Sequence, residues 1–515
     1  MMIHNVIKHN AYFDSVTLML FSSKLGGIEG VSEAAVMMGT DHNIELMKSS
    51  GILSVELASK VTANDLVIGI KADSQEVIDL AIKTLEEQFE NKTKSSEGSG
   101  AVRVKTVDAA VKKMDGLNFA IISVPGRFAA AETMKCLTSN MNVLLFSDNI
   151  TIDEENELKD FAIKKELLMM GTDCGTAIIN GVALGFANVV RRGNIGLVAA
   201  SGTGLQELTV VIDKLGGGIS QAIGTGGRDV KKEIGGKMML FALDALINDP
   251  ETQVIGIVSK PPAQEVMVKI LDKVKGITKP VVACFLGGDP RLVEGTHTIA
   301  SETIEEAAKQ LVTLSKGELT VNLNNFTEQQ LDEIVADEIS KLQGQKYLRG
   351  LYTGGTLAYE AMLILNKKIG NVYSNIAINK ELSLKDVEVS QDNTILDMGD
   401  DYFTDGMPHP MIEPKLRSER IKKEAADPQT AVILLDCVLG YGSHEDPAGA
   451  VVKAVEQAKA LQGDRHVTYI ASVCGTEKDP QVLSDQVEKL LNVGIIVLPT
   501  NAQASQLAAR ILERL

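Results

Sequence analysis

The sequence predicts an α/β fold made of several domains with parallel sheets. Apolar runs of strand length alternate with helical segments, and glycine-rich turns follow many of these runs. With 515 residues, of which 44% are hydrophobic, the chain is too long for a single core. We therefore expect roughly three or four domains, built as doubly wound units in which ligands sit beyond the carboxyl ends of the strands.

The order of the elements divides the chain into three domains and a connector. The expected bounds are 1–188, 193–316, a helical connector at 317–345, and 346–515. Turn and cap residues follow the strands of the first domain, and its polar stretch 91–100 is typical of a loop or linker. The strands are predicted at 33–38, 66–71, 119–124, 142–146, 195–200, 220–223, 254–258, 280–286, 431–438, 467–473 and 494–499.

Residues 194–207 form a strand, a glycine turn and a helix in direct succession. The apolar run stops at Ser201-Gly-Thr-Gly204, after which apolar residues recur at helical spacing. The free N–H groups and positive dipole end of such a helix start attract anions. The alternative is an ordinary turn with Ser201 or Thr203 as the N-cap. Similar glycine turns near 354 and 441 favour the anion site.

Composition and charge exclude several classes of function. The 51 basic and 68 acidic residues give a net charge of −17, which disfavours nucleic-acid binding. No apolar run has membrane-spanning length and the N-terminus lacks a signal-peptide apolar block, so we expect a cytoplasmic protein without membrane association. The five cysteines are odd in number and widely spaced, which argues against a disulfide framework and against a metal site.

Several blocks of residues resemble known families. Gly171-Thr-Asp-Cys-Gly175 and Gly196-Leu-Val-Ala-Ala-Ser-Gly-Thr203 resemble the α subunit of succinyl-CoA synthetase, and Leu439–Ser443 is similar to a turn in the ligase domain of its β subunit. A closer resemblance, to the FdrA family of acyl-CoA-synthetase-like proteins, covers nearly the whole chain. Its blocks are 37–40, 146–149, 193–196, 224–229, 258–262, 350–358, 399–402, 408–412 and 475–481.

The resemblance implies a CoA-binding, Rossmann-like domain followed by two flavodoxin-like domains of the succinyl-CoA-synthetase type. In those synthetases, two helix N-termini hold the phosphate of a phosphohistidine. The phosphohistidine motif, Gly-His-Ala-Gly-Ala, is missing from residues 287–298, and the nucleotide-binding ATP-grasp domain is absent. The residues expected to bind phosphate are Ser201, Gly202, Thr203, Gly204, Gly440, Tyr441, Gly442 and Ser443.

Other residues are candidates with two interpretations each. Arg228 and Asp229 either bind an anionic substrate or form a pair that holds their loop. Lys260 ends a strand and contacts either an anion or solvent. His297 and His444 are candidates for catalytic roles, although His297 lies in a polar, exposed type of segment and acidic residues follow His444. Cys174 is either a thiolate at a helix start or structural. Gly354, Gly355 and Thr356 are expected to bind substrate.

The FdrA resemblance implies a subunit of an oxamate carbamoyltransferase in allantoin catabolism. With two partner polypeptides, such an enzyme converts oxalurate and phosphate into oxamate and carbamoyl phosphate. One alternative is an acyl-CoA synthetase of the succinate–CoA ligase type, acting with a separate ATP-grasp subunit. Another is a non-catalytic scaffold. The expected ligands are phosphate, carbamoyl phosphate or an acyl-CoA, CoA remains an open cofactor, and the partners are other subunits of a hetero-oligomer.

Overall fold

A computed structural model describes residues 2–9, 11, 13, 15–98, 104–404 and 407–515. The chain divides into two compact units. One comprises Met1–Lys105 and Asp401–Glu413, and the other comprises Thr106–Asp400 and Pro414–Leu515. Within the described ranges, no helix has the length and apolar character needed to cross a membrane.

The first unit is built on a three-stranded antiparallel sheet with helices on both faces. Leu18, Ile70 and Ile78 pack on one face and Met47, Ile52 and Val67 on the other, because successive residues of a strand point to opposite faces. The strand order is β1-β3-β2. The elements are β1 (Met2–Lys8), α1 (Ser15–Gly26), β2 (Val31–Met38), α2 (Asp41–Ser49), α3 (Val55–Ala58), β3 (Leu66–Ala72) and α4 (Gln75–Gly98).

This unit differs from the single Rossmann-like domain expected over 1–188. Its strands pair antiparallel, a direction that the spacing of apolar residues in short strands does not reveal. The predicted loop at 91–100 is also different, since α4 continues to Gly98, and residues 99 and 100 lie outside the described ones. The other expected domain bounds stay predictions, because 106–400 and 414–515 form one compact unit.

The second unit begins with a small parallel sheet of order β4-β5-β6. Leu137, Val143, Leu145 and Leu158 form its core between the strands and the helices α6 and α7. A hairpin, β7–β8, then joins the next sheet. The elements are α5 (Val107–Lys113), β4 (Phe119–Ile122), α6 (Gly126–Thr138), β5 (Asn142–Leu145), α7 (Ile152–Lys164), β6 (Met169–Met170), β7 (Thr176–Ile179) and β8 (Val182–Gly185).

The second sheet has seven strands in the order β13-β12-β11-β9-β10-β7-β8. The first five are parallel, and their order relative to the chain is the 2-1-3-4-5 order of flavodoxin-like folds. Helices α8 and α11 cover one face, and α9 and α10 the other. The elements are β9 (Arg192–Ala199), α8 (Gly202–Lys214), β10 (Ile219–Gly224), α9 (Lys237–Asn248), β11 (Val254–Ser259), α10 (Gln264–Lys275), β12 (Val281–Phe285), β13 (Thr298–Ala300) and α11 (Ile304–Lys316).

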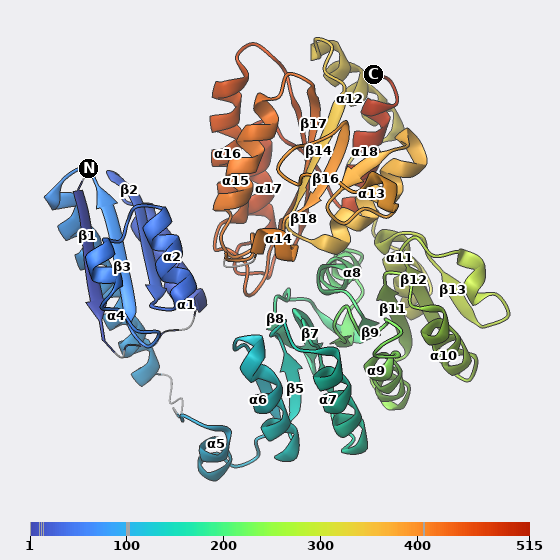
Figure 1. Ribbon diagram of the computed structural model, residues 1–515. Coiled ribbons are helices and arrows are strands. Elements are labelled where there is room, and N and C mark those ends of the chain that lie inside the picture. The colour runs from blue at the N-terminus through green and yellow to red at the C-terminus, as the bar shows by residue number, and fades with distance from the viewer. Residues whose placement is uncertain (1, 10, 12, 14, 99–103, 405–406) are drawn as a thin grey trace. The chain divides into compact units, whose positions relative to one another are not determined.

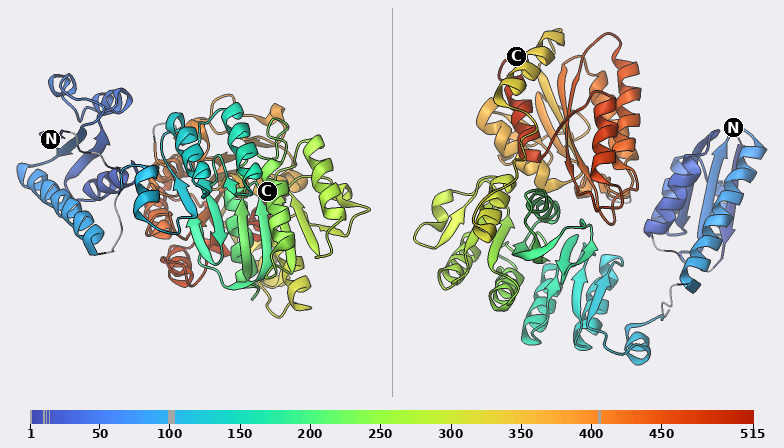
Figure 2. Two further views of the ribbon diagram at one scale, coloured as in Figure 1. Left: turned by 90° about the horizontal axis from the view of Figure 1, so that it is seen from below. Right: turned by 180° about the vertical axis from the view of Figure 1, so that it is seen from behind.

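The third sheet is parallel, has six strands and carries helices on both faces. Its order, β15-β16-β14-β17-β18-β19, is again flavodoxin-like with β15 added at one edge. Figures 1 and 2 show α15, α16 and α17 on one face and α13 and α18 on the other. The elements are α12 (Glu328–Lys341), β14 (Tyr347–Tyr352), α13 (Gly355–Ile369), β15 (Val372–Ser374), β16 (Asn393–Asp397), α15 (Lys415–Ala426), β17 (Thr430–Val438), α16 (Pro447–Gln462), β18 (Thr468–Cys474), α17 (Leu483–Asn492), β19 (Ile496–Leu498) and α18 (Asn501–Leu512). Helix α14 (Asp401–Thr404) belongs to the first unit. The predicted α/β class with two flavodoxin-like sheets is confirmed.

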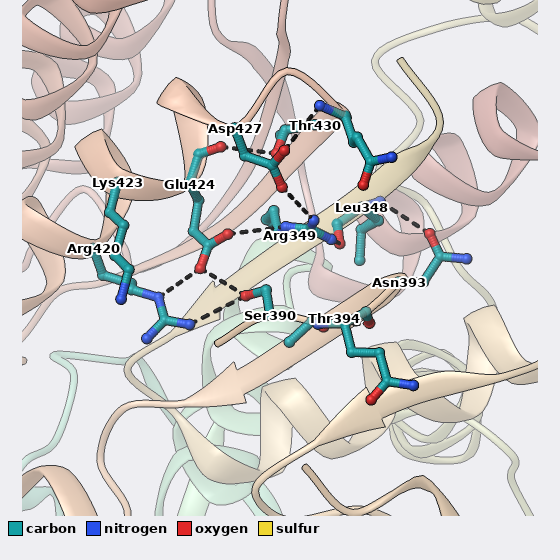
Figure 3. Close-up of polar contacts among 12 residues, drawn as sticks. Leu348, Arg349, Ser390, Asn393, Thr394, Arg420, Lys423, Glu424, Asp427 and Thr430 are labelled. Carbon is teal, nitrogen blue, oxygen red and sulfur yellow. Dashed lines mark hydrogen bonds and ion pairs between the residues drawn. The ribbon is translucent and has the colours of Figure 1, made fainter. Parts of the chain in front are cut away.

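Helix α15 packs on this sheet through buried charges (Figure 3). Arg349 of β14 lies 2.9 Å from Glu424 and 2.7 Å from Asp427. Arg420 reaches the other oxygen of Glu424 at 2.6 Å, and Ser390 donates a hydrogen bond to the same oxygen. Arg349, Arg420 and Glu424 are each less than 5% exposed, so every charge depends on its partners for compensation.

We expect Arg349→Met to lower the free energy of unfolding by about 3–5 kcal/mol, because it leaves Glu424 and Asp427 without their shared partner. The matched control is Arg291→Met, which breaks an exposed pair with Asp289 and should produce no measurable change. Urea unfolding monitored by circular dichroism measures both. Equal stability of the two variants would contradict a structural role for the network.

Candidate functional site

The first helices of the two large sheets meet at their N-termini. Ser201, the N-cap of α8, lies with its hydroxyl 2.6 Å from the hydroxyl of Thr356 in the first turn of α13. The backbone N–H of Thr356 donates to Thr203 Oγ1 at 3.4 Å. Each helix follows the first parallel strand of its sheet, β9 or β14, so the two starts occupy equivalent positions at the carboxyl edges. These edges are where doubly wound sheets bind ligands.

Two glycines permit this close approach. A Cβ on Gly204 would overlap Ser201 Oγ and lie 2.9 Å from Thr356 Cγ2. A Cβ on Gly354, the N-cap of α13, would lie 3.0 Å from the side chain of Thr203. Both helix starts therefore need glycine for packing, which is a different reason from the ligand approach that the sequence suggested.

Three backbone N–H groups at this junction have no acceptor among the described residues. They belong to Gly202 and Thr203 of α8 and to Gly355 of α13. Gly202 is exposed, and Thr203 and Gly355 are half-buried, so the groups are accessible from solvent. Donors from two helix starts, each with a positive dipole end, are suited to bind the oxygens of an anion.

A buried carboxylate holds the start of α13 from below. Asp436 of β17 accepts hydrogen bonds from the backbone of Thr353 and Gly354, at 2.8–3.1 Å, and from the Thr353 hydroxyl at 3.0 Å. Arg417 of α15 lies 3.2 Å from Asp436 and compensates its charge. Asp436 is fully buried, so its role is to fix the helix start.

Asp397 and Lys260 lie beside the start of α13. Asp397 ends β16, is 8% exposed, and approaches Gly355 so closely that a Cβ there would overlap its Oδ2. Burial raises the pKa of Asp397 to about 7, against a hydrogen bond from Gly399. Lys260 follows β11 and lies with its ammonium 4.7 Å from the centre of the Tyr359 ring. Desolvation lowers the pKa of Lys260, and the charges of Asp397 and Asp400 oppose this shift.

A second group of buried carboxylates joins the same two helices further along their length. Glu207 of α8 accepts from the backbone of Asn501, and Glu360 of α13 accepts from the Asn501 side chain at 2.8 Å. Glu360 also accepts from the backbone of Ile304 at 2.8 Å. Burial raises the pKa of Glu360 to about 7, and the charges of Glu207 and Glu305 raise it further.

The turn at 440–443 packs on Phe186 and Ala187. Tyr441 pairs through its backbone with Ala187, and a Cβ on Gly442 would lie 2.8 Å from Phe186. The following helix, α16, begins only at Pro447 and is capped by the carboxylate of Asp446. Among the described residues no hydrogen bond joins Gly440, Tyr441, Gly442 or Ser443 to the 201–204 turn, and their phosphate-binding role stays a prediction. The structure brings Ser201 and Thr203 to Gly354 and Thr356.

Four other predicted residues are engaged in the protein or lie apart. Arg228 contacts Glu155, Thr172 and the carbonyl of Ile150. Asp229 is fully buried, pairs with Lys159 and accepts from the first turn of α9. His444 accepts from the backbone of Asp446 at 3.0 Å, and His297 is exposed between β12 and β13. Arg228 and Asp229 thus hold their loop in place, which agrees with the structural one of the two interpretations. They pair with Glu155 and Lys159, however, and not with each other.

Cys174 is a structural thiol. It is 2% exposed, and burial raises its pKa to about 12. All five cysteines are buried and unbonded to one another. Among the described residues, no three His, Cys, Asp or Glu side chains are grouped so that they hold a metal ion.

Sequence reasoning did not single out Asp397, Asp436 or Glu360. A usable signal was present for Asp397, since it ends an apolar strand two residues before a glycine and therefore stands at the ligand-binding edge of a parallel sheet. Glu360 stands at the same distance from its glycine turn as Glu207 does from its own. No local signal marks Asp436, whose role depends on the neighbouring strand.

Three family models match parts of the chain. A model described as CoA-ligase matches residues 351–511, one described as CoA binding domain matches 190–287, and one described as AllF, heavy metal-associated domain matches 1–105. The CoA-binding match falls on the seven-stranded sheet and not on 1–188, where the sequence placed such a domain.

Individual proteins are similar over different lengths. A protein named YahF from Escherichia coli K12 is 46% identical over 506 residues, which cover 98% of this chain and 97% of that protein. The α subunit of an ADP-forming succinate–CoA ligase from Aquifex aeolicus VF5 is 28% identical over 42% of this chain and 77% of its own length. The apo structure of a dinucleotide-forming acetyl-coenzyme A synthetase 1 from Ca. Korarchaeum cryptofilum is 16% identical, covers 81% of this chain and 86% of that chain, and has a TM-score of 0.31.

The packing of the two helix starts predicts that Gly204→Ala lowers the free energy of unfolding by about 1–3 kcal/mol, because the added methyl group meets Ser201 and Thr356. Gly202→Ala, in the same helix turn, is the matched control, since its nearest neighbour would be 3.7 Å away. Thermal and urea unfolding compare the two. The proposed contact is refuted by a Gly204→Ala variant as stable as Gly202→Ala.

The raised pKa of Glu360 predicts a pH-dependent stability. In the folded protein Glu360 keeps its proton to about pH 7, whereas in the unfolded chain it releases the proton near pH 4.3. The contribution of Glu360 to the free energy of unfolding is therefore lost as the pH rises between these two values. Between pH 5 and 8, the free energy of unfolding of Glu360→Gln should therefore rise relative to that of the wild type, by at most about 3 kcal/mol. Urea unfolding at several pH values tests this, with the exposed Glu318→Gln as control. Parallel pH curves for wild type and Glu360→Gln would rule out the buried proton.

Proposed function

This chain belongs to the FdrA family, and we propose from that membership that it is a subunit of an enzyme that transfers a carbamoyl group to phosphate. The proposed reaction converts oxalurate and phosphate into oxamate and carbamoyl phosphate, with partner subunits contributing to the active site. The match of residues 1–105 to a model described as AllF supports a place in allantoin breakdown.

The observation that carries the proposal is the set of free N–H groups on Gly202, Thr203 and Gly355. They converge from two helix starts and are accessible, so they orient phosphate before it attacks the carbamoyl carbon. The hydroxyls of Ser201 and Thr356 turn from each other to the phosphate oxygens when it binds. The missing phosphohistidine motif agrees with phosphate as a substrate and not as a group carried by the protein.

The same N–H groups stabilise charge that develops during the reaction. As phosphate adds to the carbamoyl carbon, negative charge grows on the carbonyl oxygen, and fixed donors in a partly dehydrated site stabilise it without reorganising. Lys260, close to the start of α13, adds a positive charge on the same side. These residues bind and polarise the reactants.

A second candidate is an acyl-CoA ligase that acts with a separate ATP-grasp subunit. The matches to CoA-binding and CoA-ligase models favour it. When bound, CoA supplies the thiol that accepts the acyl group. The CoA-binding match lies on 190–287, whereas the start of α6 in the small sheet is crowded, because a Cβ on Gly126 would lie 2.5 Å from the carbonyl oxygens of Asp148 and Asn149. We derive no step through CoA.

A third candidate is a non-catalytic scaffold, favoured by the direct hydrogen bond between the Ser201 and Thr356 hydroxyls. In a scaffold these groups would only join the two domains. The two enzymatic candidates require that an anion separates or bridges these hydroxyls, and the scaffold requires that none binds.

Replacement of Gly202 by proline tests the anion site with little change to the fold. Gly202 is the first residue of α8, where proline is well tolerated, and Ser201 has the extended conformation that a residue before proline prefers. Gly202→Pro removes one free N–H, so calorimetry should show affinity for phosphate and carbamoyl phosphate reduced about tenfold or more. Gly202→Ala keeps the N–H and is the control, expected to bind like the wild type.

The outcomes separate the candidates. No heat with the wild-type chain at millimolar phosphate and carbamoyl phosphate eliminates the anion site and leaves the scaffold. Equal binding by Gly202→Pro and Gly202→Ala places any bound anion away from α8. Release of phosphate from ATP that depends on CoA, after addition of an ATP-grasp protein, identifies the ligase.

A further inference from the structure

Asp397 is a buried carboxylate beside the start of α13. Its Oδ1 accepts a hydrogen bond from Gly399 at 3.0 Å, and its backbone is held by the side chain of Asn375. Its Oδ2 has no hydrogen-bond or ion-pair partner among the residues that the structure describes, and it lies against Gly355, whose N–H is one of the three free donors. Only 8% of the surface of Asp397 is exposed. This oxygen therefore lies beside the same helix start as the free N–H of Gly355.

The charges around Asp397 come from three elements. Lys260 reaches it from the end of β11, Asp400 from the loop after β16, and Asp436 from β17. Lys231 in turn faces Lys260. Asp436 is already compensated by Arg417 and by the start of α13, whereas Oδ2 of Asp397 has no such compensation. Among these carboxylates, Asp397 alone combines burial with an oxygen open to the site.

We propose that Asp397 is the proton-transfer residue of the anion site. In the carbamoyl transfer, an oxygen of hydrogen phosphate forms a bond to the carbamoyl carbon, and the bond from that carbon to the amide nitrogen breaks. The electron pair stays on the nitrogen, which takes the proton of the Asp397 carboxyl group. Asp397 regains a proton from the attacking hydrogen phosphate. Atoms and charge balance without a co-reactant.

A carboxyl group in this position is suited to act as a general acid. A general acid is most effective when its pKa lies near the working pH, and burial raises the pKa of Asp397 to about 7. An anion bound at Gly355 favours the protonated form further, because two negative charges in contact repel. The inference rests on the anion site of the proposed function, but it makes a separate prediction: anion binding must take up a proton.

Calorimetry of the full chain with sulfate measures this uptake. Sulfate is divalent and has no proton to exchange near neutral pH, so titrations at pH 7.5 in two buffers of different ionisation enthalpy give the protons taken up by the protein. We expect the wild type to take up on the order of half a proton per sulfate. Asp397→Asn keeps the acceptor for Gly399 and should bind sulfate at least as tightly, with no uptake. Asp386→Asn, an exposed carboxylate of the same domain, should behave like the wild type.

A second variant tests the role of Asp397 independently, in case Asp397→Asn does not fold. Lys260→Met removes a cation that favours the ionised carboxylate, so the pH at which uptake is largest should move upward by roughly half a unit or more. Sulfate binding with equal proton uptake by wild type and Asp397→Asn overturns the role of Asp397 and leaves the anion site intact. Absence of sulfate binding to the wild type overturns the anion site itself, and the role of Asp397 with it.

Discussion

Two helix starts that face each other repel, because each carries the positive end of a helix dipole. Helices α8 and α13 are nevertheless in contact through Ser201, Thr203 and Thr356. The contact is possible because negative groups surround it: Asp436 and Asp397 lie at the start of α13, and Glu207 and Glu360 join the helices further along through Asn501. An anion at the free N–H groups lowers the remaining repulsion. The residues that hold the domains together and those proposed to bind substrate are therefore parts of one electrostatic arrangement.

The buried charges of α15 belong to the same arrangement. Arg420 and Glu424 fix this helix on the sheet, and one turn earlier Arg417 pairs with Asp436, which holds the start of α13. An apolar helix face would pack as well but would not compensate Asp436. The need to compensate Asp436 explains the polar inner face of α15. This helix carries both Arg420, which pairs with Glu424 in the network of Figure 3, and Arg417, which pairs with Asp436 below the start of α13.

Patterns in the sequence were sufficient for the fold class and for one half of the site. The spacing of apolar residues located β9–β12 and β17–β19 of the two flavodoxin-like sheets, and the glycine turn at Ser201–Gly204 marked the start of α8. The sequence paired that turn with 440–443, whereas the direct contacts of the Ser201 turn in the structure are with Thr356 and Gly354, which spacing along the chain does not reveal. The antiparallel sheet of residues 1–105 was not predicted, because the spacing of apolar residues in a strand is the same for parallel and antiparallel pairing. The role of Asp436 depends on contacts across the sheet, which spacing along the chain does not encode.

Both halves of the proposed anion site lie on one polypeptide. If the two helix starts lay on separate chains, their encounter would depend on protein concentration. Here the connector and α12 tie the two domains, and the effective concentration of one helix start at the other is set by the chain itself. Dilution therefore does not separate them. Selection on this protein can act on the geometry of the junction without preserving a subunit interface between the two halves.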